Sequence, residues 1–77
     1  MMRLNQWMIL FLSLIKKTIK EKTAITILYE DISGEVNKRT IHPLQYFTYN
    51  DRFYVTAFCE LRNDIRHFEL NRIKKSI

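Results

Sequence analysis

The residues best suited to bind a ligand are arginines that stand beside aromatic side chains in the stretch from Arg52 to Ile73. At strand spacing Arg66 shares a face with Phe68, and Arg72 follows where that strand is expected to end. A packed guanidinium presents a fixed fork of donors to a phosphate or carboxylate, and aromatic rings beside it can stack on bases. The stretch therefore predicts a local anion site, to which Tyr54 adds a hydroxyl from the preceding strand.

The same arginines have a second interpretation, which concerns the fold alone. Asp64 and Glu69 lie close to Arg66 and Arg72 in the sequence, and Glu60 ends the preceding strand. Ion pairs with these acids would tie the hairpin together and leave no charge for a ligand. Spacing alone does not choose between the two interpretations.

The sequence favours a binding protein over an enzyme. It contains no Ser/His/acid set in a supporting motif, no Gly-rich phosphate loop and no paired metal-ligand spacing. His42 and His67, 25 residues apart, are expected to be surface or edge histidines. Cys59 is the only cysteine, which excludes an intrachain disulfide and fits a reducing, cytoplasmic setting. Its strand spacing from Val55 and Ala57 predicts a buried core residue. We expect no cofactor and no metal.

The positive charge is concentrated at the start of the chain. The 77 residues carry a net charge of +5 and are 47% hydrophobic, as in an ordinary small globular domain. Residues 1–22 account for +4 of that charge, and residues 23–77 are nearly neutral. An anion site in the second part must therefore arise from a local arrangement of side chains rather than from a general positive field.

Residues 1–22 are predicted to form an amphipathic helix, from about residue 4 onward. Lysines and other polar residues gather on one side of the helical wheel, and an apolar stripe on the other. The stripe contains Leu4, Trp7, Met8, Phe11, Leu14, Ile15, Thr18 and Ile19.

Some apolar side chains exceed what packing on one small barrel requires. Ile9 and Leu10 interrupt the polar side, and Leu12 widens the stripe. With Trp7 they define a predicted interaction surface. Three explanations remain open: the helix forms a homo-oligomer or binds a partner protein, it lies at a membrane surface, or a longer architecture covers it. A span is not expected, because the uncharged run is only twelve residues and spanning needs about twenty.

Residues 23–77 alternate with period two and predict a small, closed or half-closed, five-stranded antiparallel barrel. One helix and this barrel make a mainly β single domain. Pro43 is expected to end the second strand, and the helix is expected to cover the second face of the first strand. The predicted strands are Thr23–Asp31, Glu35–His42, Leu44–Tyr49, Phe53–Glu60 and Ile65–Leu70, with a short turn at Asn71–Ile73 and a final extended piece.

The segment from Ile25 to Ile77 resembles the WYL domain, a bacterial Sm-like, SH3-type barrel. The matching motifs follow in order and cover roughly 60 residues. They are Ile27-Leu28-Tyr29, then Arg39-Thr40-Ile41-His42-Pro43-Leu44, then Phe53-Tyr54-Val55 in place of Trp-Tyr-Leu, and finally Arg66-His67-Phe68-Glu69-Leu70-Asn71-Arg72-Ile73.

The resemblance implies a ligand-sensing module of bacterial transcription or defence regulators, which binds single-stranded nucleic acid or a nucleotide-like anion. Carried over by motif position, Tyr54, Arg66 and Arg72 are the candidate contacts, with His42 and Arg39 at the rim.

The sequence also departs from the family pattern. Phe53 replaces a tryptophan, Asn71 replaces an aspartate, and Glu69 stands where the family commonly has a second arginine. No helix-turn-helix precedes the barrel, so we expect a stand-alone or truncated module. The alternative function is a structural or protein-interaction domain that oligomerises or docks through its helix.

Overall fold

The structure is a computed structural model that describes residues 4–77. One helix and a five-stranded antiparallel sheet make it mainly β, as predicted. The strand order is β4-β3-β2-β1-β5, so the last strand returns to pair with the first. The elements are α1 (Gln6–Glu21), β1 (Ile25–Glu30), β2 (Val36–Tyr49), β3 (Arg52–Cys59), β4 (Asp64–Glu69), the 3₁₀ helix η1 (Leu70–Arg72) and β5 (Ile73–Ser76).

The prediction that Pro43 ends a strand is wrong. β2 continues through it and pairs with β3 on both sides, Ile41 opposite Cys59 and Gln45 opposite Thr56. The register shifts between Pro43 and Gln45, which marks a β-bulge. A bulge leaves a residue outside the ladder, so it accommodates proline and bends the strand. The two strands expected around Pro43 are therefore one, and the final extended piece is the fifth strand.

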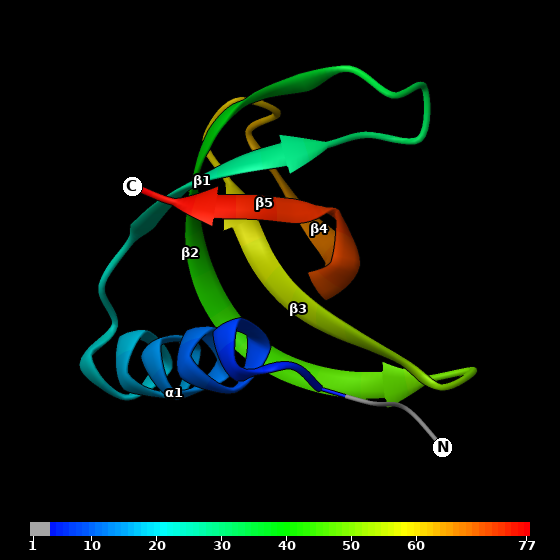
Figure 1. Ribbon diagram of the computed structural model, residues 1–77. Helices are drawn as coiled ribbons and strands as arrows, with labels where there is room; N and C mark the ends of the chain where they lie inside the picture. Colours follow the sequence, from blue (N-terminus) through cyan, green and yellow to red (C-terminus); the bar gives the residue numbers. More distant parts are fainter. Residues whose placement is uncertain (1–3) are drawn as a thin grey trace.

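The bent sheet is half-closed rather than a complete barrel. β2 curves through the length of the molecule in Figure 1 and joins β1 and β5 to β3 and β4. β4 and β5 stand at the two ends of the strand order, and no ladder joins them within residues 4–77. Of the two predicted alternatives the half-closed sheet is correct, and β4 keeps an open edge.

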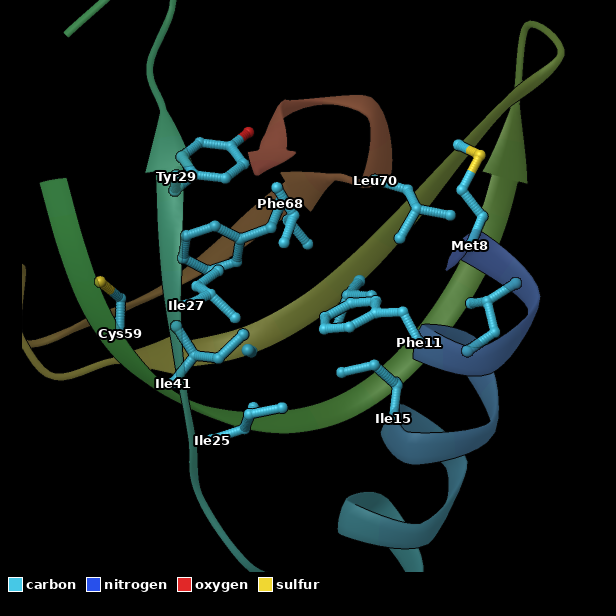
Figure 2. Close-up of a cluster of buried hydrophobic side chains, with 14 residues drawn as sticks. Met8, Phe11, Ile15, Ile25, Ile27, Tyr29, Ile41, Cys59, Phe68 and Leu70 are labelled. Carbon is cyan, nitrogen blue, oxygen red and sulfur yellow. The ribbon is translucent and has the colours of Figure 1, made fainter. Parts of the chain in front are cut away.

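The core lies inside this bend and is shared by the helix and the sheet. Figure 2 shows Phe11 and Ile15 of α1 directed toward Ile25 and Ile27 of β1. The expectation that α1 covers the second face of β1 is therefore wrong: the helix packs on the same inner face, and the outer residues of β1 are half-exposed. Cys59 is buried in the same cluster, as predicted.

Capping residues fix both ends of α1. The Asn5 side chain accepts a hydrogen bond from the Met8 N–H at 2.8 Å, and Lys22 adopts a left-handed conformation that ends the helix. Leu12 is only 7% exposed and belongs to the core, so its assignment to the interaction surface is wrong. Leu10, in contrast, is 61% exposed. No helix in the described part of the chain is long and apolar enough to cross a membrane.

The predicted turn after β1 is organised by one carboxylate. Asp31 Oδ1 accepts hydrogen bonds from the Ser33 N–H (2.9 Å), the Ser33 hydroxyl (2.6 Å) and the Glu35 N–H (3.0 Å). Gly34 supplies the positive φ that the turn requires. The hydrogen bond from the Ser33 hydroxyl, followed by the one from the Glu35 N–H, lowers the pKa of Asp31.

Leu12 and Leu10 offer a matched test of how the helix packs. We expect Leu12→Ala to lower the free energy of unfolding by about 2–5 kcal/mol because it opens a cavity in the core. Leu10→Ala should change it by less than about 0.5 kcal/mol at protein concentrations where the chain is monomeric, because the side chain is then exposed. Urea denaturation followed by circular dichroism measures both. Equal losses would contradict the packing of α1.

Asp31 should make stability depend on acidic pH. Its pKa is lower in the folded state, so the stabilisation is fully present above the unfolded value, about 4. It is lost as the pH falls through the folded pKa. We expect wild type to be more stable than Asp31→Asn at pH 7 and this difference to shrink as the pH falls below about 4. Urea denaturation at a series of pH values tests this, and a difference independent of pH would contradict it.

Candidate ligand-binding site

A hollow of about 330 Å³ opens between the β1–β2 hairpin and the segment formed by β4 and η1. It brings together four of the five residues predicted for the site, Arg39, Tyr54, Arg66 and Arg72. They lie in three different strands and the 3₁₀ helix, so only the bending of the sheet makes them neighbours. The full lining is Tyr29, Asp31, Ile32, Arg39, Tyr54, Arg66, His67, Phe68, Glu69 and Arg72.

Arg39 is the most deeply placed cation of the hollow. It is only 6% exposed, although it was predicted for the rim. In the β1–β2 ladder Arg39 lies opposite Ile27 and Asn37 opposite Tyr29, so Arg39 and Tyr29 are diagonal neighbours. The guanidinium lies 5.4 Å from the centroid of the Tyr29 ring, within cation–π range. Its Nε donates to Asn37 Oδ1 at 3.1 Å.

The guanidinium of Arg39 is left without an acidic partner in residues 4–77. No side-chain nitrogen or oxygen of the described residues is both fully buried and unpaired, so its Nη groups keep access to the hollow. Asp31 also lines the hollow. Its carboxylate accepts hydrogen bonds in its own turn, and the charge of Arg39 helps to lower the pKa of this carboxyl, but the two groups do not form an ion pair. A buried cation without a counter-ion is costly, and an anion in the hollow would compensate its charge.

Arg66 and Arg72 are both engaged in ion pairs. Arg66 Nε lies 3.7 Å from Asp64 Oδ2, and the Arg66 side chain is 52% exposed. Arg72 Nε lies 3.7 Å from Glu69 Oε1, and Arg72 Nη1 donates to the Asp31 carbonyl at 3.1 Å. The exposed pair holds Arg66 only weakly, whereas Arg72 is held from two sides. These contacts of Arg72 correspond to the second interpretation, in which the arginine stabilises the fold instead of binding a ligand.

Tyr54 belongs to an aromatic cluster beside the hollow. Its ring stacks on Phe47 with the centroids 5.2 Å apart, and Phe47 meets His67 edge-on at 5.3 Å. His67 Nδ1 is in turn hydrogen-bonded to the Thr56 hydroxyl at 2.9 Å. These contacts fix the orientation of Tyr54 at one wall of the hollow. His67 is exposed, as predicted, and also lines the hollow.

His42 does not lie at this site, and its predicted place at the rim is wrong. It alternates to the opposite face of β2 from Arg39, because successive side chains of a strand point to opposite sides. Its Nε2 lies 2.7 Å from Glu60 Oε2, and its ring packs against Phe58. His42 instead lines a separate hollow of about 450 Å³, together with Ile19, Lys22, Thr23, Pro43 and Leu44.

Sequence reasoning missed Tyr29 as a residue of the site. Its ring meets Phe68 edge-on at 5.0 Å, and its hydroxyl accepts a hydrogen bond from the Glu69 N–H at 3.1 Å. Burial raises the pKa of the Tyr29 hydroxyl, an effect only partly offset by the Glu69 N–H and the charge of Arg72. The sequence did offer a signal. Tyr29 lies on the inner face of β1, two residues before Asp31 and the turn, which places its ring near that end of the strand.

The residues predicted for the interaction surface lie apart from this hollow. Trp7, Ile9 and Leu10 are exposed on α1, and none of them lines the hollow. The Trp7 ring stacks on Phe11 at 5.1 Å, so one of its faces is covered by the helix itself. Two separate features therefore remain for function: a hollow with a buried guanidinium, and an exposed apolar helix surface.

Comparison with known proteins finds similarity to part of a transcriptional regulator and to part of a solved structure. A curated relative is 34% identical and named as an uncharacterized HTH-type transcriptional regulator, YobV, of Bacillus subtilis (strain 168). The match covers 77% of this chain but only 21% of that relative. The solved structure of proteasome accessory factor B/C (PafBC) of Arthrobacter aurescens superposes with a TM-score of 0.85 over 100% of this chain and 12% of that one, at 20% identity.

The curated relative is several times longer than the matched region, and the likeness to the solved structure concerns the fold. The family comparison agrees with the motifs found in the sequence. The model of the WYL domain matches residues 11–76, which includes α1 from Phe11 onward and all five strands. The chain belongs to the WYL domain family.

Proposed function

We propose that this chain is a regulatory ligand-sensing module that binds a phosphate-bearing ligand, a nucleotide-like anion or single-stranded nucleic acid, in the hollow beside β4. The observation that carries the proposal is Arg39, a buried guanidinium that faces the hollow without an acidic partner in residues 4–77. The transcriptional role named for the curated relative supports a regulatory use of such binding.

The roles follow from burial and pairing. Arg39 provides the fixed donor fork for a phosphate oxygen, because packing over Tyr29 and the bond to Asn37 hold it in place. Arg66 adds a second, more mobile charge, since its exposed ion pair with Asp64 is easily exchanged. Tyr54 contributes an aromatic wall on which a base can stack.

Arg39→Gln tests the proposed contact. We expect it to weaken binding of AMP and of a fluorescein-labelled dodecathymidylate by tenfold or more, about 1.4 kcal/mol. The matched control is Arg62→Gln, which removes the same charge from an exposed turn residue outside the hollow and should change affinity by less than about twofold. Calorimetry and fluorescence anisotropy measure the two ligands. Equal affinity of wild type and Arg39→Gln, or binding by neither, would contradict the proposal.

A second candidate function concerns the helix. Ile9 and Leu10 are large apolar residues exposed on α1, and exposed apolar surface of this kind marks contact with another protein. We propose that this surface mediates self-association. Light scattering coupled to gel filtration should give a mass above that of the 9.4 kDa monomer, and Leu10→Glu should restore the monomer. A wild-type monomer at all concentrations tested would exclude this role.

A further inference from the structure

The hollow contains a carboxylate of its own that competes with any anionic ligand. Glu69 lines the hollow, and its side chain is only 12% exposed. Its Oε2 accepts a hydrogen bond from Arg52 Nη1 at 3.0 Å, and its Oε1 lies 3.7 Å from Arg72 Nε. One carboxylate thus joins an arginine of β3 to an arginine of η1.

The position of Glu69 is set by the backbone as well as by charge. Its N–H donates to the Tyr29 hydroxyl, so the residue is held from β1 while its side chain extends toward the two arginines. It also lies opposite Tyr54 in the β3–β4 ladder, next to the aromatic wall of the hollow. Because the Glu69 side chain is already restrained, its contact with Arg72 costs little further conformational entropy.

The consequence is an unequal pair of cationic positions. Arg39 faces the hollow without an ion-pair partner in residues 4–77, whereas Arg72 shares the Glu69 carboxylate with Arg52 and donates to the Asp31 carbonyl. A first anionic group is attracted by the positive charge of Arg39. A second one, placed toward Arg72, must displace or approach the carboxylate of Glu69, and like charges at such short range repel.

We propose that Glu69 is a built-in counter-ion that makes the hollow select ligands with one phosphate group over diphosphates and over polyphosphate strands. The inference rests on the proposed function, because it assumes that an anion binds at Arg39. Within that function it names a nucleoside monophosphate as the ligand class and assigns specificity to a residue outside the predicted site. The volume of about 330 Å³ suits a small ligand rather than a strand.

Glu69→Gln tests the inference, because it removes the charge and keeps the size of the side chain. The full chain is titrated with AMP, ADP and labelled dodecathymidylate by calorimetry and anisotropy. Wild type should bind AMP at least about threefold more tightly than ADP, as selection against a second phosphate requires. Glu69→Gln should change the affinity for AMP by less than about threefold. It should raise the affinity for ADP about tenfold, as one new charge-assisted contact allows.

Two controls separate the local effect from net charge and from misfolding. Glu60→Gln makes the same change of charge at the pair with His42, outside the hollow, and should leave the ratio of ADP to AMP affinity unchanged. Adding Arg72→Gln to Glu69→Gln should abolish the gain for ADP, since the gain comes through that arginine. Circular dichroism confirms that each variant is folded at the temperature used.

The outcomes distinguish this inference from the proposed function. Wild-type binding of ADP as tight as or tighter than that of AMP, or an unchanged ratio in folded Glu69→Gln, overturns the role of Glu69 while binding at Arg39 stands. A gain of the same size in Glu60→Gln overturns it as well, because net charge would then explain the effect. Failure of every probe to bind wild type contradicts the proposed function and the inference with it.

Discussion

The contact between Tyr29 and the end of β4 holds the two halves of the bent sheet together. No strand ladder joins β1 to β4 in the described residues, so side chains must bridge this opening. The Tyr29 ring packs on Phe68, and its hydroxyl accepts the Glu69 N–H, which would otherwise point from the free edge of β4 without a partner. Arg72 adds a hydrogen bond to the Asp31 carbonyl. The hollow exists because these contacts span the opening without filling it.

The electrostatics of the hollow depend on the same arrangement. Tyr29 supports Arg39 on its ring and Glu69 through its hydroxyl, so one aromatic residue positions a free cation and a neutralising anion. Asp31 contributes a carbonyl to Arg72, while its carboxylate keeps its charge and accepts hydrogen bonds in the turn. The nearly neutral charge of residues 23–77 therefore conceals a local asymmetry, with a buried positive group at Arg39 and a carboxylate shared between Arg52 and Arg72.

Much of the fold could be predicted because it depends on local periodicity. The helix, the alternation of Val55 and Ala57 toward the core and the turn at Gly34 follow from spacing and backbone preference. The prediction for Pro43 failed because the compatibility of proline with a strand depends on a bulge, which pairing with β3 creates. The prediction for Leu12 failed because a helical wheel does not show how wide a stripe the bent sheet can cover.

For the site, the sequence by itself determined the family, the residue types, the strands that carry Tyr54 and Arg66, and the turn that carries Arg72. It could not rank the arginines, because the availability of a guanidinium depends on which acids lie near it in space. Only the tertiary structure decided that Arg39 is buried and unpaired within the described chain, that Arg72 is bound to Glu69, and that His42 lies on another face. The physical reason is that strand bending and ladder register, both long-range properties, set the distances between charges.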